Sequence, residues 1–185
     1  MATHYRQATT DDLDGIVETF LGCWRVSYAV VLPRQLTEAM TDERAVELWM
    51  RVLGEVAGAD VIVAESPAEL GTVILGVARL AVGAGGEGSV PSLYVSPRAQ
   101  GRGVGSGLLA AAADALLAAG SITAHLWVFR DNAPARAFYR HNGWYPDGRT
   151  RVQPEFGEPE IRLTALLCPG RPAAAGPRTS HEARA

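Results

Sequence analysis

The fold is decided by the stretch LYVSPRAQGRGVGS at residues 93–106. Its apolar start predicts a strand that Pro97 ends, and the glycines at 101, 103 and 105 predict a turn that leads into a helix. Glycine removes the Cβ atom where a ligand approaches the backbone. The first N–H groups of a helix lack intrahelical partners and lie at the positive end of its dipole, so this turn suits a phosphate or a pyrophosphate. For three glycines alone, the alternative is a tight turn without a ligand.

Two common nucleotide-binding motifs do not fit this turn. A P-loop requires Lys and then Ser or Thr after its last glycine, whereas Gly105 is followed directly by Ser106. A dinucleotide-binding fingerprint that starts at Gly103 requires Gly or Ala at position 108, which is Leu108. One that starts at Gly101 requires the small residue at position 106, which is Ser106. The sequence therefore predicts an anion-binding turn of another kind.

Hydrophobic periodicity on either side of the turn predicts a chain of mixed strands and helices. Strands are predicted at residues 4–8, 61–64, 73–82, 90–95, 122–128, 144–150 and 160–167, a turn at 66–71, and helices at 13–27, 41–54, after the glycine-rich turn and at 132–141. Short connections make the strands from 61 to 95 antiparallel neighbours. A helical crossover makes strand 122–128 parallel to strand 90–95.

The composition is typical of one globular domain. The chain has 185 residues, of which 48% are hydrophobic and 20% charged. We predict that the domain spans residues 1–167 and that the tail at 168–185, rich in Pro, Ala and Gly, is disordered. The apolar stretch at 107–120 is interrupted by Asp114 and is too short to cross a bilayer. The first residues show no apolar run of the kind that makes a secretory signal.

Charge and cysteine content narrow the expected partners. A net charge of −3 weighs against a wide nucleic-acid surface. Cys23 and Cys168 make neither a metal-ligand pair nor a disulfide framework, so no metal and a reducing, cytoplasmic setting are expected. Residues 98–140 carry five Arg against two acids, whereas the rest of the chain carries 12 Arg against 18 acids. An anionic cofactor would be attracted to the basic segment.

Two motifs, in this order, resemble those of the GNAT superfamily of acyl-coenzyme A-dependent N-acyltransferases. Q-x-x-G-x-G at 100–105, after a Leu-Tyr-Val strand, is similar to the family's pyrophosphate-binding signature. The second motif consists of LWV at 126–128, NA at 132–133, Ala137, FY at 138–139 and GW at 143–144. The resemblance covers residues 5–167. It implies an α/β (α+β) fold with a GNAT-like mixed, mostly antiparallel sheet, two splayed central parallel strands and flanking helices.

The resemblance also implies a role for each matched residue. The strand would contact pantetheine through its backbone, the turn would hold the pyrophosphate, Asn132 would contact the cofactor near the thioester, and Tyr139 would protonate the departing thiolate. The strand residues are Leu93, Tyr94 and Val95, and those of the turn are Gln100, Gly101, Arg102, Gly103, Val104, Gly105 and Ser106. The family's first helix commonly walls the acceptor pocket, which points to Trp24 and Tyr28, one helical turn apart. For Trp24, core packing is the alternative.

Elementary chemistry agrees with the acid role of Tyr139. Tyrosine has a reference pKa of about 10, so it keeps its proton at neutral pH and can supply it to a leaving sulfur. Asn132 and Tyr139 are seven positions apart and share one face of a helix. A core aromatic beside Phe138 is the alternative for Tyr139. No Cys or Ser is placed as a nucleophile, which favours direct attack in a ternary complex.

The sequence does not assign the base that takes the proton from the amine. Many members of the family carry Glu where this chain has Ser89, and a serine could only position a water. The nearest acid is Glu87, whose alternative role is that of a loop carboxylate. His125 on the neighbouring strand is the third candidate, and a satisfied strand residue is its alternative.

The sequence thus predicts an N-acetyltransferase that moves an acetyl group from acetyl-coenzyme A to a primary amine, on a small molecule or a protein N-terminus. No nucleic acid, membrane or metal is expected to take part. Family members often dimerise, so a homodimer is allowed. Two alternatives stay open, a non-catalytic acyl-coenzyme A sensor and a different nucleotide-dependent enzyme. Asn132 and Tyr139 favour catalysis, because a protein that only binds needs no acid.

Overall fold

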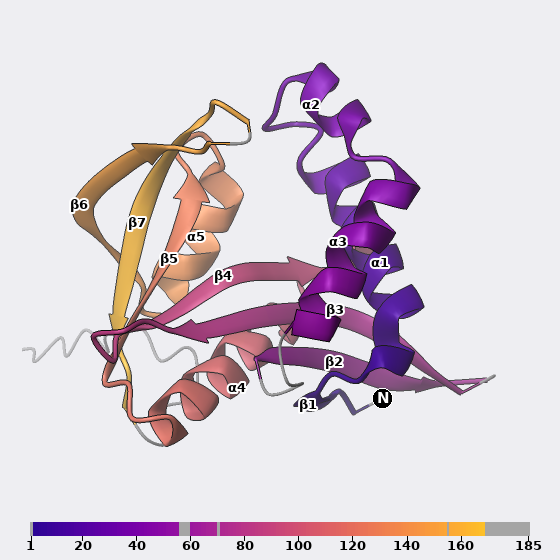
Figure 1. Ribbon diagram of the computed structural model, residues 1–185, viewed down its shortest axis with the longest axis horizontal. Coiled ribbons are helices and arrows are strands. Elements are labelled where there is room, and N and C mark those ends of the chain that lie inside the picture. Colours follow the sequence, from indigo (N-terminus) through magenta and orange to yellow (C-terminus); the bar gives the residue numbers. More distant parts are fainter. Residues whose placement is uncertain (1, 56–59, 70, 155, 169–185) are drawn as a thin grey trace, which may run out of the picture.

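The computed structural model describes residues 2–55, 60–69, 71–154 and 156–168. In this part of the chain one sheet has the strand order β1-β2-β3-β4-β5-β7-β6 (Figure 1). Its strands are β1 His4–Gln7, β2 Val61–Ala68, β3 Gly71–Val82, β4 Gly88–Val95, β5 Thr123–Phe129, β6 Tyr145–Val152 and β7 Pro159–Leu166. The helices are α1 Leu13–Gly22, α2 Arg34–Ala39, α3 Asp42–Glu55, α4 Val104–Ala118 and α5 Ala133–His141, with short turns η1 Thr10–Asp12, η2 Cys23–Ser27 and η3 Pro97–Ala99. The predicted disordered tail lies, after Cys168, outside the described residues.

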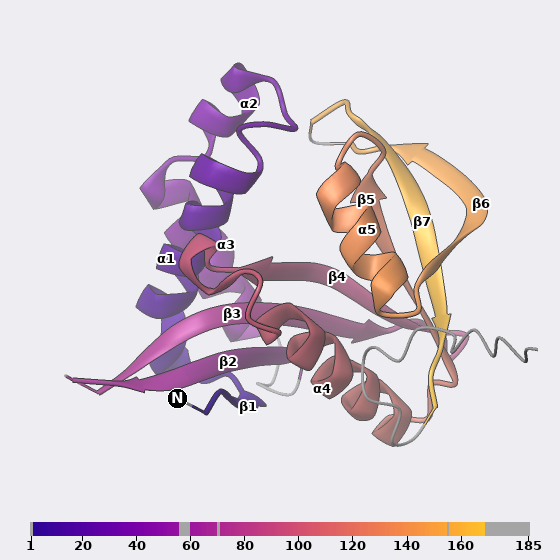
Figure 2. The same cartoon turned by 180° about the vertical axis from the view of Figure 1, so that it is seen from behind.

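β4 and β5 run parallel, whereas the other strand pairs of the described sheet are antiparallel. The two parallel strands pair only at Gly88 with Ala124 and at Ser89 with His125, although both continue well past that point. Beyond these pairs they part, as Figures 1 and 2 show. The helix α4 crosses between them, which explains the parallel direction. The predicted mostly antiparallel sheet with two splayed central strands is confirmed.

A β-bulge lies in β4 where the two strands part. Val90 and Pro91 of β4 lie opposite a single residue of β3, Leu80. The ladder is regular up to Ser89 and again from Ser92 onward. A bulge bends its strand, and Pro91 has no N–H group to leave unpaired there. The bulge therefore marks the point where β4 turns away from β5.

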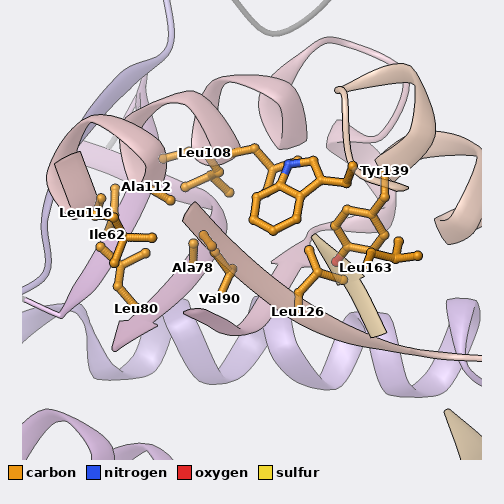
Figure 3. Packing of buried hydrophobic residues seen from close by; sticks show 14 of the residues in the cluster. Ile62, Ala78, Leu80, Val90, Leu108, Ala112, Leu116, Leu126, Tyr139 and Leu163 are labelled. Atoms are coloured by element: carbon orange, nitrogen blue, oxygen red, sulfur yellow. The ribbon is translucent and has the colours of Figure 1, made fainter. Parts of the chain in front are cut away.

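Helices cover both faces of the sheet, and each face closes a core. α4 packs on one face over a cluster that includes Ala78, Leu108 and Leu126 (Figure 3). α1 and α3 pack on the other face, where Trp49 and Phe20 are the largest fully buried side chains. Because strand side chains alternate between faces, the residues between those of the α4 cluster point to the α1 side of the sheet.

The predicted turn at residues 66–71 is too long, because the chain reverses between Ala68 and Gly71. β2 continues to Ala68, and β3 begins at Gly71. Pro67 thus lies within β2, although proline cannot donate a ladder hydrogen bond. β1 pairs with β2 only as far as Glu65, so β2 has a free outer edge at Pro67. Proline is tolerated at such an edge.

Two features of the helical region differ from the prediction. Helix α2 was not predicted; it has no buried residue, so no apolar stripe marks it. The first helix reaches Ser27 as expected, but its last turn is π-helical, and the Tyr28 N–H donates to the Cys23 carbonyl at 2.9 Å. The remaining predicted elements are confirmed within about two residues. Within the described ranges, the helices are too short or too polar to span a membrane.

Replacing Leu108 with Ala should strongly destabilise the fold. Leu108 has no exposed surface, and removing most of such a side chain leaves a cavity between α4 and the sheet. We expect the free energy of unfolding in urea to fall by about 3 kcal/mol. Leu166→Ala is the matched control, because Leu166 is 69% exposed, and should change it by less than about 0.5 kcal/mol. Equal losses in the two variants would contradict the packing.

Candidate active site

The turn between β4 and α4 is open to solvent and needs glycine at two positions. Gly101 has a φ of 73° and Gly103 a φ of 82°, both in the left-handed region that other residues adopt at a cost. A Cβ atom at either position would meet no atom within 4 Å. Residues 101–103 are exposed. The backbone of the turn is therefore accessible to a ligand, as the sequence analysis expected.

Gly105 is required for a different reason from the one expected. A Cβ atom there would lie 3.0 Å from the Phe138 ring and 3.4 Å from Val95. The third glycine therefore lets α5 and β4 pack closely against the first turn of α4, and the space beside it is not open to a ligand. The expectation that Gly105 removes a Cβ atom to make room for a ligand is therefore wrong on that side of the residue, whereas its N–H group stays unpaired among the described residues.

The amides of the turn have no protein partner. None of the N–H groups of residues 101–106 finds an acceptor among the described residues. Ser106 is half-buried and Val104 packs into the α4 core, so Val104 offers only its backbone. Arg98 and Arg102 are exposed on the same segment, which carries no acid. Unpaired amides at the positive end of the 15-residue helix α4, beside two cations, form a site for an anion.

The side chain of Gln100 holds the turn in place. Its Nε2 donates to the Val95 carbonyl and to Ser27 Oγ, both at 3.1 Å. The Cys23 Sγ donates to the same Val95 carbonyl at 3.0 Å. Burial raises the pKa of Cys23 to about 11, so the thiol stays protonated and serves as a donor. Three segments, β4, η2 and the turn, are thus tied at the Val95 carbonyl.

The backbone of β4 faces the gap at alternate residues. The Val95 carbonyl accepts from donors outside the sheet, whereas the next residue, Ser96, donates to Leu75 of β3. Because peptide directions repeat every two residues, the backbone of Leu93 also points away from β3, toward β5, and that of Tyr94 points to β3. Leu93 therefore offers free backbone groups to a ligand between the strands.

Helix α5 places Asn132 and Tyr139 beside this gap. The Asn132 side chain is the N-cap of α5, where its Oδ1 accepts from the Ala135 N–H at 3.1 Å, and its amide nitrogen stays available. Tyr139 is 9% exposed and lies at the end of the α4 cluster beside Leu163 (Figure 3). Burial raises the pKa of Tyr139 well above its ordinary value. Its hydroxyl is not among the enclosed polar atoms that lack a partner in the described residues, so it reaches an opening.

Aromatic side chains fill the other side of the gap. Trp24 and Tyr28 lie 5.2 Å apart between ring centroids, as their spacing predicted. Tyr28 is 5.9 Å from Phe129 of β5, and Trp24 is 5.2 Å from Phe156 in the β6–β7 connection. Tyr94 closes the cluster against Tyr28 at 6.3 Å. Trp24 is buried here, which agrees with the core alternative, whereas Tyr28 is only half-buried.

A polar cluster lies on the same face of β5 and β7. His125 Nδ1 lies 3.3 Å from Glu87 Oε2, and Arg162 Nη1 lies 3.7 Å from the same oxygen. Arg162 Nη2 pairs with Asp147 Oδ2 at 2.5 Å. The Ser89 hydroxyl donates to the Ala81 carbonyl at 3.2 Å. The structure thus brings together all three candidates for the base, because Glu87 lies beside His125 and Ser89 pairs with His125 in the sheet.

Several residues of this region were not predicted. Arg162, Asp147 and Phe156 come from the last two strands and their connection, and no motif marks them. Only the pairing of β7 with β5, which puts Arg162 opposite Trp127, brings them to the site. Among the described residues no group of three or more His, Cys, Asp or Glu side chains is arranged to hold a metal ion.

A separate hollow lies between η2, α2 and α3. Arg25, Met40 and Thr41 are among its lining residues, and it contains none of residues 93–106. Four of its charged side chains pair with one another, Arg25 with Asp42 and Arg34 with Glu38. This hollow does not belong to the anion site at the start of α4.

A mixed sheet with parted central strands and an unpartnered helix start between them define an α/β protein whose candidate site suits an anionic, elongated ligand. The family comparison agrees: the acetyltransferase (GNAT) family matches residues 16–144, well over half of the chain. The chain therefore belongs to the GNAT family of acetyltransferases. The match includes the turn, the parted strands and α5.

Individual relatives support the same family. The chain is 42% identical over 72 residues to a mycothiol acetyltransferase of Beutenbergia cavernae, covering 39% of this chain and 23% of that protein. It is 50% identical over 56 residues to a mycothiol acetyltransferase of Clavibacter michiganensis subsp. michiganensis, covering 30% and 18%. The chain thus spans less than a quarter of the length of either relative. PaiA N-acetyltransferase of Thermoplasma acidophilum, solved in complex with coenzyme A, shares the fold, with a TM-score of 0.67 at 19% identity over 90% of this chain and 99% of that one.

Alanine substitutions should separate the three glycines of the turn. Gly103→Ala forces a left-handed φ on a residue with a Cβ atom, at a cost of about 1–2 kcal/mol in unfolding free energy. Gly105→Ala acts through the Phe138 contact and should loosen α5. Gly85→Ala is the control, because Gly85 has neither a positive φ nor a neighbour within 4 Å, and should be close to neutral. Urea unfolding measures all three, and a neutral Gly103→Ala would contradict the described turn.

Proposed function

We propose that this chain transfers an acetyl group from acetyl-coenzyme A to a primary amine by direct attack in a ternary complex. The observation that carries the proposal is the row of unpartnered amides at residues 101–106, of which 101–103 are exposed, in the turn that follows β4 where it has parted from β5. A diphosphate at these amides places the rest of an elongated thioester alongside β4. Family membership supports the acetyl-coenzyme A part of the proposal.

Each segment then has a defined task. The amides from Gly101 to Ser106 hold the diphosphate, and Arg102 adds positive charge. The free backbone groups of Leu93 bind pantetheine between the strands, next to Tyr94 and Val95 in the same strand. The amide nitrogen of Asn132, left free by the helix cap, contacts the thioester arm. Tyr28, with Trp24 behind it, lines the space for the acceptor.

Direct attack needs a proton at the leaving sulfur, and Tyr139 supplies it. The amine nitrogen forms a bond to the thioester carbon, the carbon–sulfur bond breaks, and the thiolate takes the phenolic proton. Because burial raises the pKa of Tyr139, the proton is present throughout the neutral range. The buried thiol of Cys23 stays protonated and engaged with Val95, so it offers no route through a covalent intermediate.

The acceptor is best sought with a panel of primary amines. The panel should contain small amines such as glycinamide, polyamines, amino acids and peptide N-termini, together with the acceptor used by the mycothiol acetyltransferases that the chain resembles. Release of free thiol from acetyl-coenzyme A reports transfer. Acetylation of no member, with acetyl-coenzyme A still bound, would favour a non-catalytic sensor over the enzyme.

Replacing Tyr139 with Phe should lower turnover without weakening cofactor binding. The change removes the proton donor and keeps the buried ring, so kcat should fall about 100-fold. The Kd for acetyl-coenzyme A, measured by calorimetry, should stay within about twofold, because Tyr139 protonates only the product thiolate. Tyr145→Phe is the matched control, since Tyr145 is exposed on β6, and should change neither value. Unchanged turnover in Tyr139→Phe would contradict the role of Tyr139 as the acid.

A further inference from the structure

His125 lies at the point where β4 and β5 part. It forms the last parallel pair with Ser89, one residue before the bulge at Val90 and Pro91. Its neighbours in β5, Ala124 and Leu126, belong to the α4 core, so the His125 side chain lies on the opposite face, toward α1. The aromatic cluster around Trp24 and Tyr28, which lines the space for the acceptor, lies on that same face. A group at this position can reach an amine that approaches a carbonyl between the strands.

We propose that His125 takes the proton from the acceptor amine and that Glu87 fixes its orientation. This proposal rests on the proposed function. His125 Nδ1 is buried and lies 3.3 Å from Glu87 Oε2, within ion-pair distance but not aligned as a hydrogen bond. A lone pair on Nδ1 would be repelled by the carboxylate, so the hydrogen of the neutral ring belongs on Nδ1. The lone pair is then on Nε2, where it can accept a proton.

The surroundings of His125 suit this task. Its side chain is 23% exposed, and Nε2 is not among the enclosed polar atoms that lack a partner in the described residues. Nε2 is therefore accessible to a proton, and the ring can exchange that proton with solvent. The imidazolium that forms is stabilised by the Glu87 carboxylate, even without hydrogen-bond alignment, because charge attraction acts over this distance.

The competing groups are already engaged. The Ser89 hydroxyl donates to the Ala81 carbonyl, and the Glu87 oxygen is shared between His125 and Arg162. Arg162 is in turn held by Asp147. The groups that face His125 are Ser89 from β4, Thr164 and Arg162 from β7, and Glu87 from the connection just before β4. Asp147 of β6 pairs with Arg162.

The proton balance is simple. The amine nitrogen bonds to the thioester carbon and becomes positively charged, and Nε2 of His125 removes one of its protons. The sulfur leaves with the electrons of the broken bond and takes the proton of Tyr139. One proton enters the protein and one leaves it, so exchange with solvent restores both groups and no further reactant is needed.

The test compares His125→Gln with wild type across pH, using the best acceptor of the amine panel that contains glycinamide. At neutral pH, kcat/KM should fall about 100-fold. The loss should shrink as the pH rises, because hydroxide from the solvent can then take the proton that the attacking nitrogen must release. A merely structural role would give a constant loss. The control is His4→Gln, which changes an exposed histidine in β1 and should leave the profile unchanged.

Glu87→Gln keeps the inference testable if His125→Gln fails to fold. Glu87 is 41% exposed, so this variant should keep its fold, and kcat/KM should fall about tenfold at neutral pH with the same narrowing at high pH. A pH-independent loss, or none, in the folded variants would overturn the inference and leave the proposed function intact. A wild-type chain that acetylates no amine of the panel would instead overturn the proposed function itself.

Discussion

The parallel contact between β4 and β5 is only two residue pairs long, and the candidate site depends on that limit. A parallel ladder that continued would satisfy the backbone of both strands and leave nothing between them for a ligand. Here the bulge at Val90 and Pro91 bends β4 as soon as the pairing with Ser89 ends. The free backbone of Leu93, the open turn after the strand and the position of His125 all follow from this parting.

The structure holds the site in shape without a ligand. The Val95 carbonyl accepts from Cys23 and Gln100, which ties the end of β4 to the first helix and to the turn. Gly105 lets Phe138 press against α4 and so sets the place of α5, on which Tyr139 lies. Groups that are already ordered lose less entropy on binding. The segment that joins β4 to α4 therefore holds three elements together and also provides the amides that would bind the anion.

Local signals in the sequence account for most of the fold and half of the site. Alternating apolar strands, the crossover helix and the turn glycines were readable because each has a period or a residue requirement of its own. Helix α2 was not readable, since it buries no residue. The end of β2 was not readable either, because the free edge that tolerates Pro67 depends on where β1 stops pairing with β2. The contact of Glu87 with His125 and Arg162 depends on the pairing of β5 with β7, which no single stretch of sequence encodes.

The most direct measurement of the central claim follows the backbone amides of the turn by 1H–15N NMR while coenzyme A or pantetheine is added. The two ligands share the arm that lies between the strands, and only coenzyme A carries the diphosphate. The account predicts that coenzyme A shifts the amide signals of residues 101–106 strongly and that pantetheine leaves them nearly unchanged. Equal shifts with both ligands, or none in the turn with bound coenzyme A, would contradict it.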